Sequence, residues 1–153
     1  MNQVTKFLTC LICIFCIQHL NTSAQFWKKK RNQYINGIPE GYWIAYIDSA
    51  KTQVEYHGHY KHGHEKGKWK YYYENGRLRK KERFGKKLIH TKYYYESGKR
   101  KSSGNAILVY EGESLHYYYQ GKWKYFNEEG KLSSIVFYER GEELKTIKYD
   151  FTK

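Results

Sequence analysis

The chain has 153 residues, a formal net charge of +13 and a charged fraction of 28%, which allows one domain of ordinary size whose surface attracts polyanions. Aromatic residues make up 19% of the chain, and 18 residues are Tyr, so aromatic rings must supply much of the buried apolar area. All three Cys lie at positions 10, 13 and 16, which excludes disulfides, thiolate metal sites and Cys nucleophiles from the rest of the chain.

Residues 1–24 have the pattern of a cleaved signal peptide. Lys6 supplies a positive charge, Phe7–Ile17 is apolar apart from Cys and Thr, and Ala24 is a small residue suited to cleavage. The apolar stretch is too short to span a bilayer, which takes about 20 residues. A lipid anchor on Cys16 is a less favoured alternative, because a bulky residue precedes it. We therefore expect export to the periplasm, the cell envelope or the extracellular space, with residues 25–33 as a basic linker.

A repeated pattern dominates the remaining chain. Its clearest copy, Tyr56 to Gly76, runs Tyr-x-Gly-x-Tyr-x-x-Gly-x-x-x-Gly-x-Trp, followed by an aromatic run and Glu-Asn-Gly. Weaker copies begin near residues 30, 78, 110 and 134, so residues 34–153 are predicted to form an array of about five units. Each unit alternates with a period of two, as a strand does. The predicted fold is all-β: an elongated antiparallel sheet of stacked β-hairpin repeats.

Glycines recur at fixed positions of the units and predict its turns. The predicted structural turns contain Gly37, Gly41, Gly58, Gly63, Gly67, Gly76, Gly98, Gly112, Gly121, Gly130 and Gly141. The third unit retains fewer glycines, which leaves open whether the sheet is interrupted there. The segment Lys99–Asn105 is predicted to be an exposed basic loop inserted into this unit.

Alternation along the strands predicts two faces with different chemistry. We call the first the aromatic face; its candidate binding residues are Trp43, Trp69, Tyr71, Tyr73, Tyr93, Tyr95, Trp123 and Tyr125. The second, the basic face, carries Lys70, Lys92 and Lys124 at equivalent positions, predicted to form a row of ammonium groups. In the simplest interpretation the rings are only the hydrophobic side of a thin sheet and the lysines its solvated side.

The Tyr56–Gly76 pattern resembles the MORN repeat, in its bacterial variant, and the likeness extends over roughly Lys30 to Phe151. The resemblance implies long sheets of β-hairpins that act in protein–protein contact, membrane association or scaffolding. Some bacterial members are antitoxins, which implies neutralisation of a toxin as a further alternative. The third unit departs from the family pattern.

Four histidines, His57, His59, His62 and His64, form two His-x-His pairs, a spacing that a metal site on a strand could use. They occupy variable positions of the repeat beside structural glycines, so we expect surface histidines and no bound metal. No motif for a nucleophile or a phosphate-binding loop is present. We therefore predict a protein that is not an enzyme and needs no cofactor.

The favoured function is an exported binding or scaffold protein that uses the aromatic face to contact another protein. The first alternative is a polyanion or membrane-surface binder that uses the lysine row on an anionic envelope surface. The second alternative is an antitoxin or immunity-like protein. Aromatic rings beside lysines also suit nucleic acid or glycans, although an exported location disfavours nucleic acid. The sequence leaves the oligomeric state open.

Overall fold

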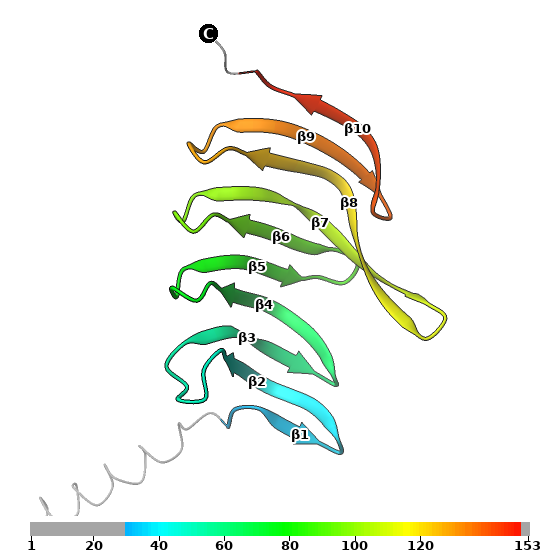
Figure 1. Ribbon diagram of the computed structural model, residues 1–153. Helices are drawn as coiled ribbons and strands as arrows, with labels where there is room; N and C mark the ends of the chain where they lie inside the picture. The colour runs from blue at the N-terminus through cyan, green and yellow to red at the C-terminus, as the bar shows by residue number, and fades with distance from the viewer. Residues whose placement is uncertain (1–29, 151–153) are drawn as a thin grey trace, which may run out of the picture. The chain divides into compact units, whose positions relative to one another are not determined.

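The computed structural model describes residues 30–150, which form one ten-stranded antiparallel sheet with its strands in chain order (Figure 1). The strands are β1 (Gln33–Ile35), β2 (Ile38–Tyr46), β3 (Val54–Lys61), β4 (His64–Tyr72), β5 (Leu78–Phe84), β6 (Ile89–Tyr94), β7 (Arg100–Glu111), β8 (Ser114–Phe126), β9 (Leu132–Glu139) and β10 (Glu142–Lys148). The prediction of an all-β sheet of consecutive hairpins is confirmed. The predicted signal peptide and residues 25–29 of the predicted linker lie outside the described residues. The last residue of that linker, Gln33, belongs to β1. Within residues 30–150, no helix is long and apolar enough to span a bilayer.

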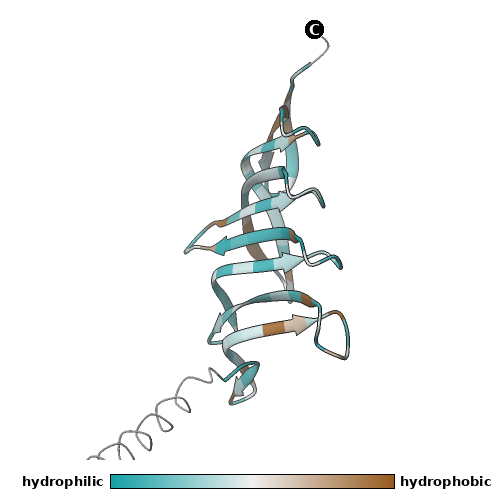
Figure 2. Ribbon diagram, turned by 90° about the vertical axis from the view of Figure 1, so that its left-hand side faces the viewer, coloured by the Kyte–Doolittle hydropathy of each residue, from teal (hydrophilic) through white to brown (hydrophobic). Residues whose placement is uncertain are grey.

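The described sheet is a single layer, so neighbouring strands of the same sheet must bury each other's side chains. The buried apolar residues are Trp69, Ile89, Ala106, Trp123, Ile135 and Val136. Hydrophobic residues form short patches on ribbons that are otherwise hydrophilic or neutral (Figure 2). Trp69 and Trp123 are the largest of the fully buried side chains, which agrees with a composition in which rings supply much of the buried area.

Two kinds of turn join the strands. The β3–β4 turn is a two-residue turn at His62 and Gly63, both with positive φ (51° and 78°), as a type I′ hairpin turn requires. At the opposite ends of the strands, the Gly76 N–H donates to the Tyr73 carbonyl (2.9 Å), and the turns at Gly98 and Gly130 repeat this bond. The predicted turn glycines Gly37, Gly63, Gly76, Gly98, Gly112, Gly130 and Gly141 all lie in such connections.

Four predicted turn glycines are corrected, because they lie inside strands. Gly41, Gly67 and Gly121 belong to β2, β4 and β8, and Gly58 belongs to β3. Around Gly67 the pairing shifts between His57–Lys70 and His59–Lys66, so β4 carries two more residues than β3 there. This bulge bends the strand and re-aims the side chains beyond it. The sequence pattern marked special backbone positions correctly but did not separate bulges from turns.

The predicted loop Lys99–Asn105 is also wrong. Only Lys99 lies in a turn, and the remaining residues form the start of β7, which pairs with β6 from Tyr94–Arg100 to Ile89–Ala106. Ser102 is only 5% exposed. Small polar residues suggested a loop, but with a strand on each side they pair in the sheet. The sheet is therefore continuous through the third unit.

The fourth unit begins about eight residues before its predicted start at Tyr110. Gly104 packs against Trp123 as Gly58 packs against Trp69, which identifies Gly104 as the equivalent glycine. Trp69 follows its glycine by 11 residues and Trp123 follows by 19. The additional eight residues extend the β7–β8 hairpin past its neighbours, as the projecting yellow hairpin in Figure 1 shows.

Candidate functional site

The aromatic face is closed by its own packing at Trp69 and Trp123. A Cβ placed on Gly58 would lie 2.1 Å from the Trp69 ring, and one on Gly104 would lie 2.3 Å from the Trp123 ring. Each indole therefore covers the bare backbone of the neighbouring strand. Trp69 is 1% exposed and Trp123 is 0% exposed, so neither ring can contact a partner in this conformation. Trp43 is half-buried between Tyr34 and Tyr60, with ring centroids at 5.1 and 5.4 Å.

The predicted tyrosines of this face are brought together as one half-buried layer. Hydroxyl groups tie the layer to the sheet: Tyr73 donates to the Tyr94 carbonyl (2.7 Å) and Tyr95 donates to the Phe126 carbonyl (2.8 Å). The members of the layer among the predicted residues are Tyr71, Tyr73, Tyr93, Tyr95 and Tyr125. Their packing role is visible here, and their role in binding stays a prediction.

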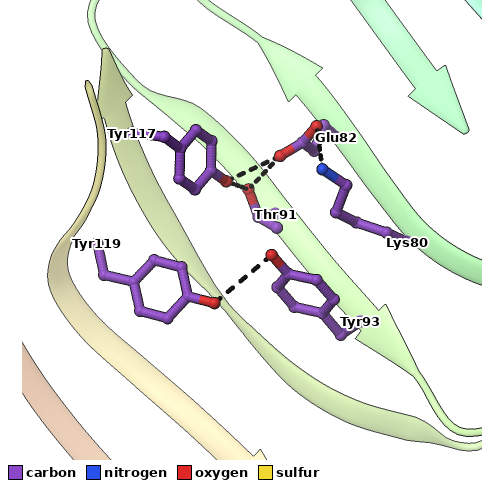
Figure 3. Close-up of polar contacts among 6 residues, drawn as sticks. All are labelled: Lys80, Glu82, Thr91, Tyr93, Tyr117 and Tyr119. Carbon is purple, nitrogen blue, oxygen red and sulfur yellow. Dashed lines mark hydrogen bonds and ion pairs between the residues drawn. The ribbon is translucent and has the colours of Figure 1, made fainter. Parts of the chain in front are cut away.

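The third unit replaces the Trp–Gly pair with a buried carboxylate, shown in Figure 3. Glu82 lies opposite Thr91, and both residues are 1% exposed. Glu82 Oε2 pairs with Lys80 Nζ (3.0 Å), while Tyr117 OH donates to Glu82 Oε1 (2.8 Å) and lies 2.7 Å from Thr91 Oγ1. Nearby, Tyr119 OH donates to Tyr93 OH at 3.5 Å. We call Lys80, Glu82, Thr91 and Tyr117 the Glu82 network.

The Glu82 carboxylate and Thr91 are buried and fully partnered, while Tyr117 and Lys80 form the solvent side of the network, an arrangement that suits a structural role. Burial, together with the Glu82 carboxylate, raises the pKa values of Tyr71 and Tyr117 far above the ordinary tyrosine value, so both stay protonated at neutral pH. Both Glu82 oxygens are engaged by neighbouring side chains. Sequence reasoning missed this network; the signal was Thr91 at a position where three other units have Trp.

The basic face carries two rows of cations across the middle of the sheet. In the central row, Lys70 lies opposite Lys81, and Lys81 lies opposite Lys92. The row continues through Ser103 to Lys124. Beside it runs a second row, in which Arg83 lies between Lys68 on β4 and His90 on β6. The predicted lysines therefore do form a line; the structure adds Lys81 to this line and places Lys68 and Arg83 beside it.

These cations lack acidic neighbours. Within residues 30–150, no carboxylate lies within 4.0 Å of the charged groups of Lys68, Lys70, Lys81, Arg83 or Lys92. Like charges directly opposite each other destabilise a sheet, so the rows cost folding free energy in the free protein. Lys68, Lys81, Arg83, His90 and Lys92 line a hollow of about 370 Å³, and the buried Glu82 also contributes to its lining. The arrangement can hold anionic groups that neutralise it.

The histidine cluster is divided by the β3–β4 turn. His57 and His59 lie on the basic face beside the Tyr42 ring (5.8 and 5.2 Å). His62 lies in the turn, where its N–H donates to Glu40 Oε2, and His64 begins β4. Among the described residues, no group of three His, Cys, Asp or Glu side chains could hold a metal ion. Burial and the Lys70 ammonium lower the pKa of His57 below 6.5.

Comparison of the chain with family models, with curated proteins and with solved structures finds no match. The resemblance to MORN repeats therefore stays a prediction from sequence. Functional inference depends on the two faces themselves.

Proposed function

We propose that this chain is a non-enzymatic binding module whose basic face engages a polyanion. The observation that carries the proposal is the run of directly opposed cations, Lys70, Lys81 and Lys92, with no carboxylate beside them among the described residues. Opposed like charges weaken a sheet, and a bound anion removes that cost. An anionic surface in the cell envelope is the setting that the predicted signal peptide favours.

The test is retention of the full chain, after any processing, on heparin and on vesicles containing an anionic phospholipid. The triple variant Lys70→Gln, Lys81→Gln, Lys92→Gln should elute at clearly lower salt than the wild type. Because each phosphate contact contributes about 0.7–0.9 to the slope of log K against log salt, loss of three contacts should reduce that slope by about two to three. A matched triple variant, Lys61→Gln, Lys86→Gln, Lys87→Gln, has the same net charge.

If both triple variants lose retention equally, net charge governs binding and the basic face has no special role. If neither ligand retains the wild type at low salt, the polyanion proposal is wrong. Heparin and vesicles present sulfate and phosphate respectively, so their comparison also separates a polysaccharide from a membrane surface.

Contact with another protein is a second candidate, favoured by the projecting β7–β8 hairpin. Leu108, Tyr110 and Leu115 on this hairpin are 40%, 65% and 50% exposed, and they line a hollow of about 230 Å³ together with Lys86 and Lys87. Exposed apolar side chains gathered on one surface often mark contacts. Changing Leu108 and Leu115 to Ser should release a protein that co-purifies with the wild-type chain from its own envelope fraction.

A further inference from the structure

One groove on the basic face stands apart from the repeat. It has a volume of about 660 Å³, within the range typical of small-ligand sites. Three rings from adjacent strands line it: Tyr42 on β2, His57 on β3 and Tyr72 on β4. The His57 ring lies 5.8 Å from each of the other two, and His57 Nε2 is 3.0 Å from Tyr72 OH. The His57 ring is tilted by 45° against the Tyr42 ring and by 24° against the Tyr72 ring, so the three rings together form a curved wall.

Two connecting segments supply a polar rim to this groove. The β2–β3 loop contributes Thr52 and Gln53, and the β4–β5 turn contributes Glu74 and Asn75. The side chains of Gln53 and Glu74 have no hydrogen-bond partner among residues 30–150. The rim therefore offers an amide and a carboxylate, groups that donate to and accept from hydroxyls.

The rim is held in place before any ligand arrives. The Asp48 carboxylate accepts hydrogen bonds from the Thr52 and Gln53 N–H groups (3.0 and 2.7 Å), which lower the pKa of Asp48 to about 2. Across the groove, the Arg77 guanidinium donates to the Glu96 carbonyl (2.6 Å) and fixes the β4–β5 turn. The β2–β3 loop is also longer than the corresponding turns of the later units, so this departure from the repeat builds the groove wall.

The groove and the central row meet at His57. This residue lines the groove and lies opposite Lys70, from which Lys81 and Lys92 continue across the sheet. A ligand that fills the groove and continues along the row needs one unit with apolar C–H faces and hydroxyls and further units with negative charge. A nucleic acid has a phosphate on every unit and would bring one close to Glu74, which disfavours it.

We propose that the groove binds one uncharged ring of an acidic oligosaccharide that contains both neutral and anionic sugars, and that the central row binds its anionic groups. The ring packs against the wall of Tyr42, His57 and Tyr72, and its hydroxyls hydrogen-bond to Gln53 and Glu74. This inference rests on the proposed polyanion binding and names the class of polyanion.

The test uses a hyaluronan hexasaccharide, which alternates acidic and neutral sugars, beside inorganic polyphosphate, neutral maltohexaose and single-stranded dT6, measured by titration calorimetry on the full chain. Tyr72→Leu should weaken hexasaccharide binding about tenfold, since loss of one ring contact removes about 1.4 kcal/mol. Tyr94→Leu is the matched control, because Tyr94 occupies the equivalent position in the next unit and does not line the groove. Gln53→Ala, at an exposed loop position, should weaken binding several-fold without touching the sheet.

Polyphosphate has charge but no ring, so its affinity should fall with the Lys70/Lys81/Lys92 triple variant and stay unchanged in Tyr72→Leu. If the hexasaccharide behaves like polyphosphate in every variant, the sugar groove is wrong while polyanion binding stands. If dT6 alone binds in a Tyr72-dependent manner, the groove takes nucleobases and the inference is overturned. Absence of binding to all four probes overturns the groove and the proposed function together.

Discussion

Two residues set the thickness of this sheet: a glycine on one strand and a tryptophan on the next. Gly58 has no side chain, so the Trp69 ring lies flat on its backbone, and the indole N–H points to the His59 carbonyl (3.3 Å). Gly104 and Trp123 repeat the arrangement, with a bond of 2.8 Å to the Asn105 carbonyl. A single-layer sheet can in this way bury its largest side chains completely.

Gly58→Ala should destabilise the protein by about 1–3 kcal/mol, the usual cost of overpacking. The new methyl group would overlap the Trp69 ring, and that ring lies against a rigid sheet. Urea unfolding gives the free energy, and a shift in tryptophan emission reports movement of the indole. Gly76→Asn is the control, because Gly76 has open space around it and a positive φ that Asn tolerates. Equal losses from both substitutions would contradict close packing at Gly58.

Titration of His57 reports the electrostatics of the basic face. Its pKa lies below 6.5 because of burial first and the Lys70 ammonium second. The folded state therefore favours the neutral imidazole. The contribution of this preference to the free energy of unfolding is present above pH 6.5 and is lost as the pH falls through the lowered pKa. Lys70→Gln should raise the pKa of His57 toward 6.5, measured by NMR. Lys124→Gln, farther along the same face, should leave it unchanged; an unchanged value in both variants would rule out control by Lys70.

At the scale of elements, the long β7–β8 hairpin is the feature that the repeat does not supply, and contacts on both sides hold it. On the aromatic face, Tyr117 reaches the buried carboxylate of Glu82. On the other side, the Arg140 guanidinium from the β9–β10 turn pairs with Glu111 (2.6 Å). This ion pair, and a hydrogen bond from the Tyr118 hydroxyl, lower the pKa of Glu111. The Glu82 network therefore takes the place of a Trp–Gly pair and also fastens the hairpin.

Tyr117→Phe should cost about 1.5–3 kcal/mol, because it removes a hydrogen bond to a buried, charged carboxylate. Hydrogen exchange should accelerate in the tip of the β7–β8 hairpin more than in β2–β4, since the lost contact fastens that tip. Tyr110→Phe on the same hairpin is the control, as Tyr110 is 65% exposed and its hydroxyl has no bond to a described residue. A loss no larger than that of the control would show that the carboxylate does not depend on Tyr117.

The hairpin also shows how far the sequence could lead. Period-two alternation and recurrent glycines are local signals, and they predicted the sheet of hairpins, the lysine line and seven of the eleven turn glycines, while the other four glycines lie inside strands. The position of the eight additional residues depends on which glycine packs against Trp123. From the sequence alone, either Gly104 or Gly112 could make this contact, and only the pairing of the strands decides between them. The groove was missed for the same reason, because Tyr42, His57 and Tyr72 become neighbours only once the register of three strands is known.

At the scale of the whole described sheet, chemistry is divided between the faces. Trp69, Trp123 and the Glu82 network satisfy the aromatic face internally, whereas Lys70, Lys81 and Lys92 leave the basic face with unbalanced charge. A sheet with both faces satisfied would be more stable alone. Under the proposed function a bound polyanion balances this charge, which leads to a prediction about the free protein.

The triple variant Lys70→Gln, Lys81→Gln, Lys92→Gln should be more stable than the wild type at low salt, by about 1 kcal/mol, because opposed like charges each cost a few tenths of a kcal/mol or more. Urea unfolding at 20 mM and 1 M NaCl measures this, and the gain should vanish at high salt, where the screening length is about 3 Å. Polyphosphate should raise the melting temperature of the wild type and leave the variant nearly unchanged, since a ligand stabilises only the state that binds it. The Lys61, Lys86 and Lys87 control should gain nothing. A triple variant less stable than wild type at both salt concentrations would mean that these lysines support the fold, and the opposed charges would then give no support to a polyanion ligand.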